Sequence, residues 1–247
     1  MVGLAALGCR GTLSPLSNRL AVGQEAYVVF VATGEGGAGD LYASSAGGGP
    51  VFPISYTRVD ESAPALSPDG VSLAFIRSRS TSDTLTRSVW VMNLLSGEER
   101  ALPPVEPDSR PMRLGWSTDG KVIYIRTDRG IGAAHAPPSA PDPKALGADT
   151  AAADTALGVW VGQPVFAGVG PCPTGDALCV FPGASAPQAI APGSHDPVRW
   201  GGDSLGYFVG ADLFVRPLGP GAQRRLTWAP PPSRPREPTY FGPPTTP

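Results

Sequence analysis

Short apolar runs bounded by turn residues recur along the chain. Residues 73–76 and 122–125 are apolar at successive positions, which is typical of strands buried on both faces. Each run follows a polar tetrapeptide, Ser-Pro-Asp-Gly at 67–70 and Ser-Thr-Asp-Gly at 117–120. Asp can accept hydrogen bonds from the backbone ahead of it, and Gly supplies a positive φ. The pattern therefore predicts a tight turn that joins two strands.

This unit repeats. An aromatic residue or leucine opens each copy, and successive copies are 50, 44, 40 and 40 residues apart: Leu66, Trp116, Trp160, Trp200 and Tyr240. Third strands are expected at 40–42, 88–92, 176–180 and 212–215, and fourth strands near 51–52, 100–102, 144–146, 188–190 and 225–227. A period of about 40 to 50 residues built from strands indicates a β-propeller, in which each unit is one four-stranded blade.

The two ends of the chain complete one another. Residues 26–56 supply a second, third and fourth strand without a first, and residues 238–242 read as a first strand without the others. Pairing them would close the ring and remove its exposed edges. We therefore predict an all-β propeller of five four-stranded blades, the first closed by N- and C-terminal strands. A six-bladed ring is the alternative if residues 130–160 contain a degenerate blade.

The segments SPDGVSLAFIRS, SVWVMNLLSGEERAL and STDGKVIYIRTD resemble the repeats of TolB-type propellers, a family of bacterial envelope and secreted proteins. The resemblance covers about residues 25–242. It implies the propeller fold, a periplasmic location and binding to other proteins. The family's repeat residues are structural, so the resemblance assigns no catalytic residue.

The N-terminal segment carries a second, separate resemblance. Residues 2–9 end in Cys9 after a short apolar run, which resembles the end of a bacterial lipoprotein signal. The resemblance implies a lipid on Cys9 that holds the protein at a membrane surface. The alternative is an ordinary apolar N-terminus with a free thiol. We expect a signal-like segment and tether at 1–24, one propeller domain at 25–242 and a Pro-rich tail at 243–247. No run of residues has the length and apolarity of a transmembrane helix.

Two further cysteines, Cys172 and Cys179, enclose six residues. Pro173 and Gly175 make this segment turn back, so the two thiols can meet across a hairpin. In an exported protein we expect a disulfide, whereas in the cytosol two free buried thiols are the alternative.

Composition and motifs favour a protein without catalytic chemistry. The net charge of −2 gives no reason to expect binding of nucleic acid, which usually requires a strongly basic face. The chain has only two histidines, His135 and His195, and no nucleophile elbow, phosphate-binding loop or zinc-protease motif. The acidic pairs at 60–61 and 98–99 are expected to be solvated in turns. We therefore predict no enzyme, no cofactor and no metal.

Recognition is expected on the loops at one end of the propeller, where fourth strands lead to first strands and second strands meet third strands. Arginine is over-represented in protein interfaces. We expect residues 77–87 to form a long loop there and His195 and Asp196 to lie in another. The candidate partner-binding residues are Arg58, Arg77, Arg79, Arg87, Arg110, Arg129, His195 and Asp196.

The leading hypothesis is a non-catalytic, membrane-extrinsic periplasmic propeller that binds membrane proteins as an accessory subunit of a larger envelope complex, for which a respiratory or photosynthetic complex is one host. The alternative is a propeller that binds a sugar or peptide in its central funnel. A hydrolase built around His195 is the third hypothesis.

Overall fold

The computed structural model describes residues 16, 18–33, 37–81, 84–146, 151–157, 169–181, 186–201, 203–219, 221–227 and 233–242. These residues form five antiparallel sheets, four of them with four strands. The first contains β19 (Ser233–Phe241), β1 (Tyr27–Thr33), β2 (Gly39–Ser45) and β3 (Val51–Pro53). The second contains β4 (Asp60–Leu66), β5 (Ser72–Ser80), β6 (Leu85–Asn93) and β7 (Glu99–Ala101).

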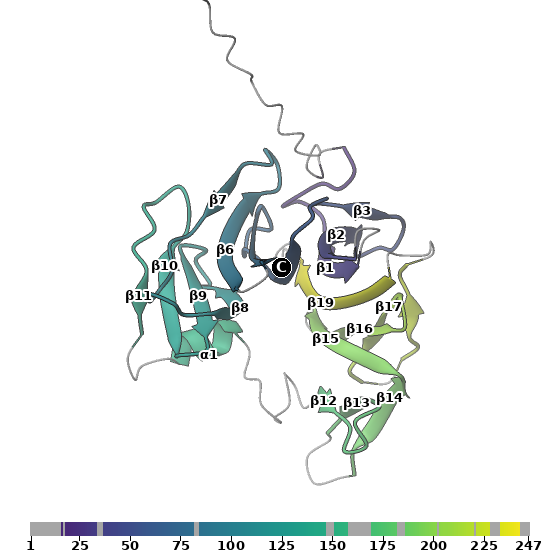
Figure 1. Cartoon of the computed structure of the whole chain (residues 1–247). Coiled ribbons are helices and arrows are strands. Elements are labelled where there is room, and N and C mark those ends of the chain that lie inside the picture. Colours follow the sequence, from purple (N-terminus) through teal and green to yellow (C-terminus); the bar gives the residue numbers. More distant parts are fainter. Residues whose placement is uncertain are drawn as a thin grey trace, which may run out of the picture.

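The third blade contains β8 (Pro111–Trp116), β9 (Val122–Thr127), β10 (Ile131–His135) and β11 (Lys144–Ala145). A short helix, α1 (Ala151–Leu157), precedes the fourth sheet, which contains β12 (Val169–Pro171), β13 (Ala177–Val180) and β14 (Gln188–Pro192). The fifth contains β15 (Ser194–Trp200), β16 (Ser204–Val209), β17 (Asp212–Pro217) and β18 (Arg224–Arg225). The sheets surround a common centre, and β8, β15 and β19 lie on its inner side (Figure 1). The all-β propeller predicted from the sequence is confirmed.

The predicted closure of the first blade is also confirmed. β19 pairs with β1 in antiparallel register, with Tyr27 opposite Phe241. The rings of these two residues pack 5.6 Å apart, and the Tyr240 ring packs 4.6 Å from Trp200 in the next blade. The C-terminal strand β19 therefore completes the first blade by pairing with β1, and it also packs against the fifth blade.

Continuous apolar strands arise because adjacent blades cover both faces of a sheet. In β1, Tyr27 and Val29 pack in the core shared with the second blade. Val28 and Phe30, which alternate with them, pack against the fifth blade, where Phe208 lies 5.4 Å from Phe30. Both faces are thus dry, so no polar alternation remains in the sequence of this strand.

The polar tetrapeptides form the expected turns. Asp69 accepts a hydrogen bond from the Val71 N–H at 3.0 Å, and Gly70 has φ +66°. Asp119 does the same with Lys121 at 3.1 Å, and Gly120 has φ +70°. The two turns share one geometry because they share one side-chain chemistry.

The region before the fourth sheet differs from expectation. The repeat marked by Trp160 was expected to begin with a first strand, but residues 155–157, which precede it, end helix α1. Alanine has the highest helix propensity, and four of the seven residues of α1 are alanine. The helix packs against β8 at Gly115, where a Cβ atom would lie 2.4 Å from the Ala156 carbonyl oxygen. The strand expected around Trp160 lies outside the described residues, as do Cys9 and residues 243–247.

Residues 130–146 contribute β10 and β11 to the third blade, and the described part of 130–160 forms no additional sheet. No helix among the described residues is both long enough and apolar enough to span a membrane.

Candidate functional site

Two regions gather the predicted site residues. The first is one end of the propeller, which we call the 4–1 face because loops 54–59 and 102–110 there lead from a fourth strand to the next first strand. The junction of β5 with β6 and turn 128–130 lie at the same end. Five of the predicted arginines lie there with exposed side chains: Arg58, Arg79, Arg87, Arg110 and Arg129. Of these, Arg129 donates a hydrogen bond to the Pro107 carbonyl at 2.9 Å, which ties two loops of this face together.

Arg77 was predicted to bind a partner, but the structure contradicts this. It lies within β5, and only 8% of its surface is exposed. Its Nε donates to Glu61 at 2.9 Å, and its two terminal nitrogens donate to Glu99 at 2.6 and 2.9 Å. The guanidinium stacks over Trp90 at 4.6 Å from the ring centroid. Arg77 therefore joins strands of the second blade and offers no contact to a partner.

Glu61 is also a correction, because it is fully buried rather than solvated. It accepts a hydrogen bond from the Ser55 hydroxyl, whose oxygen in turn accepts the Leu41 N–H at 2.9 Å. Burial raises the pKa of Glu61, and the bonds from Ser55 and Arg77 oppose that rise. The result is a buried polar connection between the first and second blades.

The segment 77–87 is mostly strand rather than loop. β5 and β6 pair without interruption from Ser72 opposite Asn93 to Ser80 opposite Leu85. The hairpin is therefore longer than the neighbouring β9–β10 hairpin, which pairs five residues of each strand. Its end projects the exposed side chains of Arg79 and Arg87 from opposite faces, because successive strand residues alternate.

His195 and Asp196 lie in β15 rather than in a loop. Their side chains are half-buried and 2.8 Å apart, and the other ring nitrogen of His195 lies 3.3 Å from the Gly210 carbonyl. The imidazole also packs against Phe208, with ring centroids 5.8 Å apart. The hydrogen bond with Asp196 raises the pKa of His195 and outweighs the opposing effect of burial.

The second region is a central cavity of about 1040 Å³ lined by the inner strands β4, β8, β15 and β19, by α1 and by the β12–β13 turn. Three of these strands contain a bulge at the same place, where a residue with positive φ precedes proline: Ala63 (50°), Asp196 (49°) and Glu237 (53°). A bulge redirects side chains and interrupts pairing. A proline at the same point of three repeats is a sequence signal for these bulges that the sequence analysis did not use.

Charges of both signs line the central cavity, including Arg113, Arg199, Asp176 and Glu237. Burial lowers the pKa of Arg113, and the nearby Arg126 lowers it further, while Glu237 opposes both effects. Glu237 also accepts a hydrogen bond from the Ala63 N–H, which fixes β19 against β4. The cavity can therefore accommodate a ligand that carries both acidic and basic groups.

Exposed apolar side chains are the feature that sequence reasoning missed on the 4–1 face. Tyr56 and Leu85 expose 65 and 44% of their surfaces there. Met112, exposed to 55%, lies at the adjoining start of β8 and also lines the central cavity. Leu95, exposed to 51%, lies at the opposite end of the blade. No simple sequence signal separates them from the many buried apolar residues of the repeats.

Cys172 and Cys179 form a disulfide across the β12–β13 hairpin, with Cα atoms 4.9 Å apart. Within the described ranges, no group of three or more His, Cys, Asp or Glu side chains is placed to hold a metal ion.

No known protein family's sequence profile matches the chain, and no curated protein matches it in sequence. Among solved structures, TolB from Acinetobacter baumannii is 14% identical over 88% of this chain and 67% of its own, with a TM-score of 0.39. A putative TolB from Agrobacterium tumefaciens is 18% identical over 81% of this chain and 60% of its own, with a TM-score of 0.41. A periplasmic gluconolactonase from Pseudomonas aeruginosa is 15% identical over 83% of this chain and 69% of its own, with a TM-score of 0.32.

Proposed function

We propose that this propeller binds other proteins through its 4–1 face. The observation that supports the proposal is the composition of that surface. Exposed Tyr56 and Leu85 lie among exposed arginines, and exposed Met112 lies at the adjoining start of β8. Tyrosine, methionine and arginine are the side chains enriched in protein interfaces, because each combines a large contact area with a polar or adaptable group.

We further propose that the protein works in the bacterial periplasm, attached to the membrane through Cys9, as an accessory subunit of an envelope complex. The disulfide between Cys172 and Cys179 fits this proposal, because such bonds persist in oxidising compartments. Mass spectrometry of the mature protein from native membranes tests the anchor. A diacylglycerol-modified Cys9 is the expected result, and an unmodified N-terminal segment would contradict it.

Site-specific photocrosslinking tests protein binding. A photoreactive residue replaces Tyr56, Leu85 or Met112 in cells of the source organism, and Leu95 serves as the matched position at the opposite end. We expect one defined crosslinked protein from the first three positions and none from Leu95. Equal labelling from both ends, or no crosslink from any position, would contradict the proposal.

The central cavity supports a second candidate function, the binding of a small ligand such as a sugar or short peptide. Its volume of about 1040 Å³ is at the upper end of ordinary ligand pockets. Calorimetric titration with panels of sugars and peptides tests this candidate, with Arg199→Ala as the variant because Arg199 is an exposed cavity residue. Binding that the variant weakens would support it, and the absence of any binding would contradict it.

A further inference from the structure

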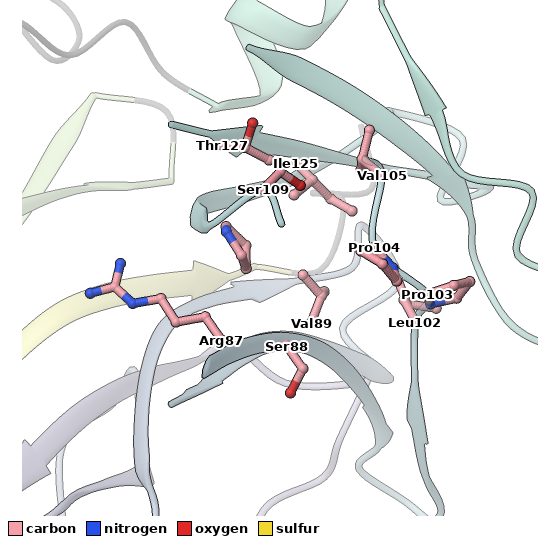
Figure 2. A pocket seen from close by; sticks show the side chains of 11 residues that line it. Arg87, Ser88, Val89, Leu102, Pro103, Pro104, Val105, Ser109, Ile125 and Thr127 are labelled. Carbon is pink, nitrogen blue, oxygen red and sulfur yellow. The ribbon is translucent and has the colours of Figure 1, made fainter. Parts of the chain in front are cut away.

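A small apolar cavity lies between the second and third blades, beside the 4–1 face. It has a volume of about 130 Å³. Val89 and Ile125 face each other across it, Pro104 and Val105 close one side, and Arg87 extends from the other (Figure 2). An aliphatic cavity of about 150 Å³ accommodates a benzene molecule. This one therefore has room for a single apolar side chain.

The strand edge next to this cavity is open. β7 pairs with β6 only from Trp90 to Met92. The last backbone hydrogen bond between these two segments is donated by the Leu102 N–H to the Val89 carbonyl at 2.8 Å. Pro103 and Pro104 follow and have no N–H to donate. The outer edge of β6 from Leu85 to Ser88 is consequently unpaired by any described residue.

The direction of the free backbone groups follows from the strand register. Val89 and Asn93 direct backbone groups toward β7 and its turn, since the Val89 carbonyl accepts from Leu102 and the Asn93 N–H donates to Glu98. Pairing with β5 shows no bulge along β6, so the alternation continues. The N–H and C=O groups of Leu85 and Arg87 therefore point outward from the sheet.

Side chains on this part of β6 face the cavity side. Val89 belongs to the core between the second and third blades, and Arg87 and Leu85 lie on the same face by alternation. Arg87 is exposed and forms no ion pair with any residue in the described part of the chain. A peptide strand on the open edge would place alternate side chains on this face, so an apolar one can enter the cavity and an acidic one can meet Arg87.

We propose that the open edge of β6 binds an extended segment of a partner protein by β-strand addition. One aliphatic or aromatic side chain of the segment fills the inter-blade cavity, and an Asp or Glu two residues away, on the same face of the strand, pairs with Arg87. Main-chain hydrogen bonds supply affinity in this mode, and pockets for alternate side chains supply specificity. The inference rests on the proposed protein-binding function and specifies the partner's chemistry.

Synthetic decapeptides with alternating Thr and Val provide the probe, with a central Leu or Ala and an Asp or Lys two residues from it on the same face of the strand. Binding to the full chain is measured by fluorescence anisotropy, and the bound edge is located by amide chemical shifts of Leu85 and Arg87. We expect Leu to bind tens of fold more tightly than Ala, because about three buried methylene equivalents are lost. We also expect Arg87→Glu to reverse the preference from Asp to Lys.

Two variants make the test specific. Arg79→Glu is the matched control, because Arg79 is an exposed arginine of the same hairpin on its opposite face. Pro104→Phe places a ring over the cavity from an exposed position and should weaken Leu peptides to the level of Ala peptides. Circular dichroism confirms that each variant folds.

The outcomes separate the inference from the proposed function. Peptides that do not bind at millimolar concentration, or an Arg87→Glu effect equal to that of Arg79→Glu, overturn strand addition. If photocrosslinks from Tyr56 persist in that case, the 4–1 face still binds protein. If they are also absent, both proposals fail.

Discussion

Replacing Arg77 by methionine should destabilise the propeller strongly. The substitution keeps the aliphatic part of the side chain but removes the guanidinium, which lies over the Phe75 and Trp90 rings. Glu61, whose side chain has 0% exposure, would then retain only the bond from Ser55. Glu99 is less affected, because 22% of its side chain is exposed to water.

The magnitude follows from the burial of the pair. Removing one partner of a buried ion pair costs about 3–5 kcal/mol, because the remaining charge has lost its compensation. For a chain of this length, that cost lowers Tm by roughly 6–20 °C. Replacing both groups removes the uncompensated charge, so the double variant Glu61→Gln/Arg77→Met should recover most of the loss.

Urea unfolding followed by circular dichroism measures these free energies, with the disulfide kept oxidised. Arg79→Met is the control, since it removes an exposed arginine from the same strand and should change stability by less than about 0.5 kcal/mol. The reasoning is refuted if Arg77→Met costs less than about 1 kcal/mol. It is equally refuted if the double variant costs the sum of the two single ones, because the residues would then be uncoupled.

Two further predictions concern the inner strands and the closure of the ring. The pKa of His195, raised above its ordinary 6.5 by the hydrogen bond with Asp196, should fall in Asp196→Asn when measured by NMR titration. Because the pKa of His195 is higher in the folded state than in the unfolded state, the interaction with Asp196 stabilises the fold fully below pH 6.5, and this stabilisation is lost as pH rises through the folded pKa. A pKa of His195 that is unchanged in Asp196→Asn would argue against this cause. Gly70→Ala should destabilise by about 1–3 kcal/mol more than Gly210→Ala, because both positions have positive φ but only at Gly70 does a Cβ lie 2.5 Å from the Phe241 ring. Equal losses in thermal unfolding would show that strain at φ alone is responsible.

Much of the fold is encoded locally. Turns such as 67–70 form from their own side chains, and strand β1, which is covered on both faces, is apolar from Tyr27 to Ala32. Because each blade is built from neighbouring residues, the repeat could be recognised without knowing how blades pack. The pairing of β19 with β1 could be predicted because each end of the chain lacks the strand that the other supplies.

The candidate sites depend on contacts that are distant in sequence. Glu61 and Arg77 look like surface charges in the sequence, and they are buried because Ser55, Glu99 and Trp90 surround them in space. The open edge of β6 likewise depends on where Pro103 leaves the sheet relative to Val89.

Short-range patterns in the sequence specify the propeller class, the turn chemistry of the repeats at 67–70 and 117–120 and the pairing of the two chain ends, and they leave five and six blades as alternatives. Which charges are buried, which apolar side chains remain exposed and where cavities open depend on the tertiary packing. Burial depends on the packing of one blade against the next, and residue type alone does not specify that packing.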